Sequence, residues 1–518
     1  MLKQRASKQQ ITCIATTPGE SLHYYLQKCT IEKDVAAGRL CYDRIVRTHF
    51  ETPSFWGDQL IRLFAAGRML SDSIKVFDGV LSPTLYTWNA IMSAHMHVDD
   101  PHGVIRLYHG MQLNCVRPDR ITFLCMLKAC ISLTDLLQGR IMYVLICEHG
   151  LGADHIIGNA VVHMFSKLGR LEEAHRVFNA LIVRDRISWG ALITGYVQQG
   201  FPRLALDLYE NMQKAGVGHD RVILLCVSKA VSCLGVLTAG RVLHNDAVKD
   251  GLDLDIVLGS ALIDMYAKCE SMLEAGKLFD KLPKRNVVSW GALIGGFSSQ
   301  GDHIMVCLLY ERMEQEGIQA DRVILLCVLK AYGCLGALWQ GCSIDDLLRR
   351  TCIDVDVVLG STLAEMYVLC GSVEDAHKVV MDINSPNNIL WGMLIGGYAI
   401  CGNHVMVGKC LATMQQQGLT PDHMVFTQVL ASCSHSGLLD IGFDCFSSIL
   451  ANQRPVSSME LYTCIVDLFG RAGRLDAAVN LIKTMPFCPD DIAQRSLLTG
   501  RKTHMNTGRK THMNTGLD

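Results

Sequence analysis

Cysteine and histidine, the side chains best suited to catalysis, are abundant in this chain, but their spacing fits no known catalytic pattern. There are 22 cysteines and 19 histidines in 518 residues. A zinc-dependent deaminase needs an H-x-E segment together with P-C-x-x-C, so that metal ligands and a general acid/base converge. The single H-x-E is His49-Phe50-Glu51, and no C-x-x-C occurs. Walker loops, H-E-x-x-H and nucleophile elbows are also absent. The sequence predicts no enzyme, no metal site and no cofactor.

The cysteines follow an internal period instead of a reactive motif. Cys125, Cys226 and Cys327 are evenly spaced, and no secretory signal precedes them. Because small apolar thiols pack well and disulfides form mainly in secreted proteins, we expect reduced cysteines in the core.

Four tryptophans define this period. Trp88, Trp189, Trp290 and Trp391 are separated by 101 residues each time, and WGALITGY, WGALIGGF and WGMLIGGY begin at the last three. A fixed internal period is the signature of a stacked-repeat architecture. The tryptophans are predicted to pack in the core rather than to serve as platforms for bases.

Bulk composition adds two constraints. The 48 basic and 50 acidic residues nearly balance, so the whole molecule lacks the basic field typical of nucleic-acid binders. No run of eighteen apolar residues occurs, so no transmembrane helix and no membrane partner are expected.

The 101-residue unit divides into segments of 35, 35 and 31 residues, each with the pattern of a helical hairpin. In the segment from Ile256, apolar residues share one helical face, and a second amphipathic helix ends before Pro283. Ser271 with Glu274, and Ser372 with Asp375, have capping-box spacing. One hairpin cannot bury this apolar surface alone, so hairpins must stack on their neighbours.

At this point the chain resembles a known family. Hairpins of this length with GYVQQG-like turns, the segment ALIDMYAKC, and a closing Pro-Asp (Pro118-Asp119, Pro421-Asp422) are similar to pentatricopeptide repeats. The 35/35/31 alternation resembles the plant PLS subclass. Tetratricopeptide repeats, which keep to 34 residues, would not produce it. The resemblance implies an all-α, right-handed α-solenoid of about fourteen hairpins.

The resemblance covers residues 19–490 and places the first helix of each repeat. The expected starts are Gly19, Ser54, Leu85, Arg120, His155, Arg186, Arg221, Ile256, Val287, Arg322, Val357, Asn388, His423 and Met459.

The family resemblance also identifies candidate RNA-binding residues. Each hairpin contacts about one base through two or three side chains, and by resemblance these include the fifth residue of the first helix and the last residue of the repeat. Asn offers a donor and an acceptor, ionised Asp only acceptors, and Ser or Thr a hydroxyl. The two side chains of a pair should therefore face each other across a common channel. The pairs are Asn89/Asp119 and Asn159/Asp185 (resembling uracil-preferring pairs), Ser260/Asn286 and Ser361/Asn387 (adenine), and Thr463/Asp490 (guanine).

Other repeats depart from this pattern, because the fifth residue is Gly190, Gly291 or Gly392 in three of them and Leu124, Leu225 or Leu326 in three more. Glycine has no side chain to donate, and leucine cannot read a base edge. Specificity should be concentrated in the 31-residue repeats and the one at Leu85. The competing interpretation is that the Asn and Asp residues are helix caps and turn formers, which both types favour.

The two ends of the chain differ from the repeats. Residues 1–18 contain Lys3, Arg5 and Lys8 and no acid, which resembles an organellar transit segment, with a basic disordered N-terminus as the alternative. Residues 491–518 begin like the E-type extension of editing factors and then carry GRKTHMNT twice. This resembles a truncated E motif, too polar and short to fold alone.

The resemblance implies a specificity factor for C-to-U editing of mitochondrial or chloroplast transcripts. It would bind single-stranded RNA, and a deaminase-bearing protein would act in trans. Two alternatives remain open: a factor for transcript stability or processing, and a helical scaffold that binds proteins.

Overall fold

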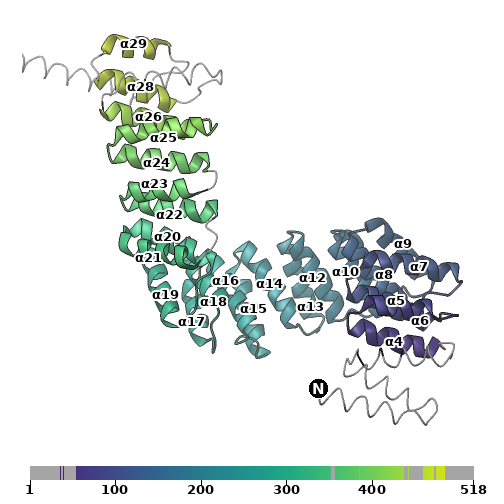
Figure 1. Cartoon of the computed structure of the whole chain (residues 1–518). Helices are drawn as coiled ribbons and strands as arrows, with labels where there is room; N and C mark the ends of the chain where they lie inside the picture. The colour runs from purple at the N-terminus through teal and green to yellow at the C-terminus, as the bar shows by residue number, and fades with distance from the viewer. Residues whose placement is uncertain are drawn as a thin grey trace, which may run out of the picture. The chain divides into compact units, whose positions relative to one another are not determined.

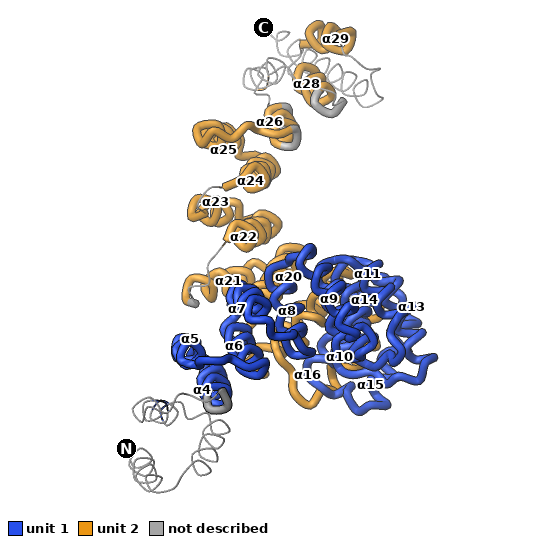
Figure 2. Tube along the Cα trace, turned by 90° about the vertical axis from the view of Figure 1, so that its right-hand side faces the viewer, with its two compact units in different colours: residues 1–269 blue, residues 270–518 orange. Residues whose placement is uncertain are grey.

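The computed structural model describes residues 54–351, 356–383, 386–436, 459–471 and 474–484, together with the single positions 36, 39, 42 and 442. The described residues are helices joined by short turns (Figure 1). They divide into two compact units, residues 1–269 and 270–518, which Figure 2 colours blue and orange.

Each unit is a row of helical hairpins. In unit 1 the helices are α4 (Ser54–Ala66), α5 (Leu70–Asp78), α6 (Leu85–His97), α7 (Pro101–Leu113), α8 (Arg120–Leu133), α9 (Leu136–Glu148), α10 (His155–Lys167), α11 (Leu171–Ala180), α12 (Arg186–Gln198), α13 (Pro202–Lys214), α14 (Arg221–Leu234), α15 (Leu237–Lys249) and α16 (Ile256–Lys268). In unit 2 they are α17 (Met272–Lys281), α18 (Val287–Ser299), α19 (His303–Gln315), α20 (Arg322–Leu335), α21 (Leu338–Thr351), α22 (Val357–Leu369), α23 (Val373–Asp382), α24 (Asn388–Ile400), α25 (His404–Gln416), α26 (His423–Ser436), α28 (Met459–Arg471) and α29 (Leu475–Thr484). From Ser54 to Met459, every expected first-helix start coincides with the first residue of a helix, whereas Gly19 lies outside the described residues.

Within each unit the hairpins form two layers. The first helices pack against one another in chain order, as α10 does with α8 and α12. A second helix contacts its own first helix and the next one, as α13 does with α12 and α14. The first residues and caps of successive first helices therefore recur at regular intervals along one layer.

Glycine closes the turn within several hairpins. After α12, Gly200 has φ +80°, a left-handed conformation that glycine adopts without a steric penalty. The amides of Gly200 and Phe201 donate to the carbonyls of Val197 (3.2 Å) and Tyr196 (2.9 Å), the pattern of a Schellman motif. Gly301 repeats this conformation after α18, with φ +76°.

The periodic tryptophans lie in the core, as the sequence predicts. Trp290 and Trp391 are 0% exposed, and Trp88 and Trp189 are also buried. The Trp290 ring packs edge-on against Phe279, with ring centroids 4.6 Å apart. These indoles join neighbouring hairpins and present no face for stacking a base.

The 31-residue segments are shorter because their second helices are shorter. Helix α11 has ten residues, whereas α13, from a 35-residue segment, has thirteen. The capping boxes predicted at these second helices are wrong: Ser271 and Ser372 make no side-chain cap bond. The Ser372 hydroxyl instead donates to the Asp375 carboxylate (2.6 Å), and the Ser271 hydroxyl donates to Glu274. A hydrogen bond to an ionised carboxylate is stronger than one between neutral groups.

Candidate nucleic-acid interface

The last residue of each repeat caps the first helix that follows. From α6 to α26, the side chain of this residue accepts a hydrogen bond from the backbone N–H three residues on; the caps are Thr84, Asp119, Asp154, Asp185, Asp220, Asp255, Asn286, Asp321, Asp356, Asn387 and Asp422. The capping interpretation of these residues is therefore confirmed. A cap uses one acceptor of a carboxylate, however, so its other acceptors remain available for a second role.

Asn89 and Asp119 meet across two neighbouring first helices. The Asn89 Nδ2 donates to Asp119 Oδ1 at 2.9 Å, and Thr122 Oγ1 donates to Asn89 Oδ1 at 2.7 Å. The same Asp119 Oδ1 accepts from the backbone N–H of Thr122 at 3.0 Å. One carboxylate thus caps α8 and holds the amide that projects from α6.

Asn159 and Asp185 repeat this arrangement between α10 and α12. The Asn159 Nδ2 lies 3.0 Å from Asp185 Oδ1 and 2.9 Å from Oδ2. The Ser188 backbone N–H donates to Asp185 Oδ1 at 2.9 Å. The Asn159 Oδ1 has no hydrogen-bond partner among the described residues and is buried.

The two asparagines are far less exposed than an open channel would require. Asn89 is 4% exposed and Asn159 is 5% exposed, while Asp119 and Asp185 are half-buried. Each amide therefore faces its aspartate, as the pairing predicts, but the burial of both asparagines does not fit the open channel that the sequence also predicts.

Hydrogen bonds keep Asp185 ionised. Burial acts to raise the pKa of this carboxyl, but the hydrogen bonds from the Ser188 backbone N–H and the Asn159 amide outweigh it, so the pKa is lowered. The carboxylate consequently accepts only, and the NH2 group of Asn159, not its carbonyl, must face it.

The serine positions have different local partners. The Ser260 hydroxyl donates to the carbonyl of Ile256 at 2.6 Å, and Ser361 donates likewise to Val357. Asn286 and Asn387 cap α18 and α24. Thr463 is a half-buried residue of α28, and its predicted partner Asp490 lies outside the described residues.

Two features of this layer are additional to the predicted pairs. Asp58 is the fifth residue of α4. Burial raises the pKa of this carboxyl, although the Thr87 hydroxyl and the charge of Arg62 act to lower it.

The second residue of every first helix from α6 to α24 is an exposed large apolar side chain: Tyr86, Ile121, Ile156, Ile187, Val222, Val257, Val288, Val323, Val358 and Ile389. The sequence carried a signal for these residues, because an apolar side chain recurs at the second position of each first helix, with the same spacing as the repeats.

Arginine is the first residue of four first helices, α8, α12, α14 and α20. Arg221 Nε lies 3.0 Å from Asp255 Oδ1, the cap of the next first helix, and Arg120 Nη1 lies 3.7 Å from Asp154 Oδ2. These arginines are about half exposed, so the pairs add little stability. They place positive charge beside the caps in a chain whose net charge is only −2.

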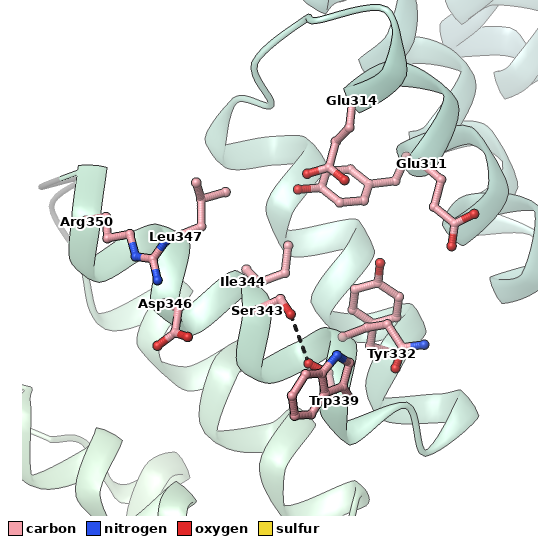
Figure 3. Close-up of a pocket in the computed structure, with 11 residues that line it drawn as sticks. Glu311, Glu314, Tyr332, Trp339, Ser343, Ile344, Asp346, Leu347 and Arg350 are labelled. Atoms are coloured by element: carbon pink, nitrogen blue, oxygen red, sulfur yellow. Dashed lines mark hydrogen bonds between the residues drawn. The ribbon is translucent and has the colours of Figure 1, made fainter.

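A pocket elsewhere in unit 2 is lined mainly by negatively charged side chains. It has a volume of about 460 Å³ and lies between α19, α20 and α21 (Figure 3). Glu311, Glu314 and Asp346 line it together with one arginine, Arg350, and with Trp339, which is 83% exposed. Three carboxylates against one guanidinium repel phosphate, so this pocket does not suit a nucleic-acid backbone.

The described residues include no group of three or more His, Cys, Asp or Glu that could hold a metal ion. Within those same ranges, no helix combines the length and apolar character needed to cross a membrane.

Comparison with known proteins identifies relatives of the whole array. A family model described as "PPR repeat" matches residues 86–116, 159–185, 187–217, 260–287, 288–318 and 460–487. A pentatricopeptide repeat-containing protein of Arabidopsis thaliana is 32% identical over 479 residues, covering 92% of this chain and 71% of that protein. Another from that plant, named mitochondrial, is 30% identical over 415 residues, covering 80% of this chain and 69% of that protein.

Further relatives are named chloroplastic or mitochondrial. Against four of these plant proteins, the chain spans between 54% and 71% of their own length. Among solved structures, PPR10 in complex with an 18-nucleotide psaJ RNA element matches with a TM-score of 0.54 and 14% identity, covering 93% of this chain and 85% of that one. That similarity establishes a shared fold.

Proposed function

Because this chain belongs to the pentatricopeptide repeat family, we propose that it binds single-stranded RNA in a sequence-selective way along the layer of first helices. The observation that carries the proposal is the hydrogen bonding of Asn89 to Asp119 and of Asn159 to Asp185. The PPR10 structure, whose partner is an RNA element, supports the same class of ligand. We also infer that the hairpins wind into a right-handed superhelix.

The chemistry of the asparagine pairs favours uracil. The aspartate accepts only, so it holds the NH2 group; at Asn89 this leaves one amide hydrogen and the second lone pair of the carbonyl for a base. Uracil presents an N–H donor beside a carbonyl acceptor, which complements that edge. The exposed apolar side chains at the second residues, such as Ile156 and Ile187, would contact the faces of the bases.

The 35/35/31 alternation supports assignment to the PLS subclass, and we infer from it a role in C-to-U editing of mitochondrial or chloroplast transcripts. The deaminase would come from a partner in trans. The names of the plant relatives support an organellar location.

The alternative is a factor that protects or processes transcripts. Organellar RNA from plants lacking the protein separates the two, since editing is lost at discrete sites in one case and transcript ends change in the other.

A salt titration distinguishes RNA binding from a protein-binding scaffold. Single-strand binding that neutralises several phosphates should weaken steeply with salt, with a log–log slope of roughly −0.7 per phosphate contact. A flat response would favour the scaffold and contradict the proposal.

A single substitution tests sequence selectivity. Asn286→Asp exchanges an amide for a group that only accepts, so the base preferred at the position matching the repeat at Ile256 should change. Both residues can cap α18, so the fold should be retained. An unchanged preference in a binding assay with RNAs differing at that one position would contradict base reading.

A further inference from the structure

Four copies of the 101-residue unit vary together at two positions. The fifth residue of the tryptophan-bearing helix is Asn89 in the first copy and Gly190, Gly291 and Gly392 in the others. The third residue of the following first helix is Thr122 in the first copy and Ile223, Ile324 and Val425 in the others. An amide is thus accompanied by a hydroxyl, and glycine by an aliphatic side chain.

These two positions touch in all four copies. Thr122 is 0% exposed, and its Oγ1 donates to Asn89 Oδ1 at 2.7 Å. A Cβ atom added to Gly190 would lie 3.3 Å from Ile223 Cγ1. The corresponding distances are 3.7 Å from Gly291 to Ile324 and 3.3 Å from Gly392 to Val425. The aliphatic chain therefore packs where the asparagine side chain would otherwise begin.

The same correspondence extends to other repeats. The polar fifth residues Asp58, Asn159 and Ser260 are followed by Thr87, Ser188 and Ser289, and the leucines Leu124, Leu225 and Leu326 by Ile157, Leu258 and Leu359. Two repeats do not follow this correspondence, because the polar fifth residues Ser361 and Thr427 are followed by Leu390 and Leu461.

We propose that the third residue of each first helix is a positioning residue for base recognition by the preceding repeat. This inference rests on the proposed RNA-binding function. The hydroxyl of Thr122 holds the Asn89 carbonyl while Asp119 holds the NH2 group, so the amide has one orientation toward a base. In the repeat at His155 this bond is not made: the Ser188 hydroxyl donates to the Asp185 carbonyl (2.8 Å), and Asn159 Oδ1 has no hydrogen-bond partner within the described part of the chain.

An aliphatic residue at the same place excludes this arrangement. Ile223 is 1% exposed and offers no donor, so an asparagine opposite it would bury an unsatisfied carbonyl. The glycine repeats consequently read no base for two reasons, the missing fifth side chain and the apolar partner. Replacing the glycine alone should not restore base reading.

The loss-of-function test compares Thr122→Val with Thr122→Ser in the full chain. Both variants keep a small side chain, but only serine keeps the hydroxyl. Binding would be measured by fluorescence anisotropy with four RNAs that differ only at the position matching the repeat at Leu85. The unmodified chain and Thr122→Ser should keep their uracil preference, and Thr122→Val should lose about three- to tenfold of it, the value of one hydrogen bond.

The outcomes separate the two claims. If the unmodified chain binds none of the RNAs, the proposed function and this inference both fail. If it prefers uracil and Thr122→Val keeps the full preference, the positioning role fails and the proposed function stands. Circular dichroism of the variants verifies that they remain folded.

A gain-of-function test does not depend on destabilising a native contact. Gly190→Asn combined with Ile223→Thr rebuilds the Asn89/Thr122 arrangement, and Asp220 already provides the carboxylate. The double variant should acquire a uracil preference of about three- to tenfold at its matching base. Gly190→Asn alone, and Gly190→Asn with Ile223→Val, should acquire none. An equal gain in the single variant would overturn the proposal.

Discussion

Replacing Asp185 by alanine should destabilise the protein more than the same change at Asp220, although both residues cap a first helix. Asp185 accepts from the Ser188 backbone N–H at 2.9 Å and from the Asn159 amide at 3.0 and 2.9 Å. Asp220 accepts from the Ile223 N–H at the same distance of 2.9 Å, but the fifth residue of its repeat is Gly190, which has no side chain to pair with it.

The expected magnitudes follow from these contacts. Loss of an N-cap reduces the free energy of unfolding by about 1 kcal/mol. Asp185→Ala also leaves the Asn159 NH2 group unpaired at a site that is 5% exposed, which adds about 1–3 kcal/mol. Asp185→Ala should therefore cost about 2–4 kcal/mol in total, and Asp220→Ala only about 1 kcal/mol.

Urea denaturation followed by circular dichroism measures the difference. Adding Asn159→Ala provides the control, because Asp185→Ala should then cost no more than a cap, about 1 kcal/mol. Equal losses for Asp185→Ala and Asp220→Ala, or no coupling between Asn159 and Asp185, would refute the argument that this carboxylate holds the amide.

Three further predictions concern pH, the core and the thiols. The pKa of Asp185 is lowered in the folded state, so the stabilisation by this carboxylate is complete above its unfolded-state pKa of about 4 and is lost as pH falls through the folded-state pKa. The urea midpoint of Asp185→Ala should therefore fall less steeply between pH 7 and pH 3 than that of the unmodified chain. Trp290→Ala should lower the free energy of unfolding by about 3–5 kcal/mol, because the ring is fully buried; weaker RNA binding with unchanged stability would instead indicate a stacking role. Burial raises the pKa of the Cys130 thiol to about 12, whereas Cys115 is exposed, so iodoacetamide at pH 8 should modify Cys115 and spare Cys130 in the folded protein, as mass spectrometry would show.

Much of the fold follows directly from periodicity. The helix starts from Ser54 to Met459 follow from the 35/35/31 spacing, because each repeat must bury the same apolar face against its neighbours. The burial of Trp290 follows for the same reason. In the described residues all cysteines are free thiols, but the predicted core position holds only for some of them, because Cys125 and Cys130 are buried whereas the repeat-locked Cys233 and Cys334 are exposed.

The candidate site was less accessible to sequence reasoning. Residue type suggested that Asp119 and Asp185 are caps and the family resemblance that they contact bases, but a carboxylate has several acceptors and can cap a helix while also holding an asparagine. The contact between Thr122 and Asn89 joins residues 33 apart, and only the packing of neighbouring first helices brings them together. The low exposure of Asn159 has the same origin, since neighbouring hairpins cover it.

The capping boxes show the limit of local patterns. Ser271 and Glu274 have the required spacing, yet the serine hydroxyl donates to the glutamate and makes no cap bond to the helix backbone. Spacing fixes which groups can meet, and the relative strength of the available hydrogen bonds decides which of them do.

Selection of binders from a randomised RNA pool tests the central claim most directly. Paired polar side chains contacting successive bases predict uracil for the repeat at Leu85, uracil two positions on for the repeat at His155, and then adenine at two later positions, each three further along, for the repeats at Ile256 and Val357. Guanine should follow three positions beyond the second adenine for the repeat at Met459. Enrichment of that spaced pattern, with unselected bases between, is the predicted result. Tight binding without base preference at those positions, or no enrichment of RNA at all, would contradict it.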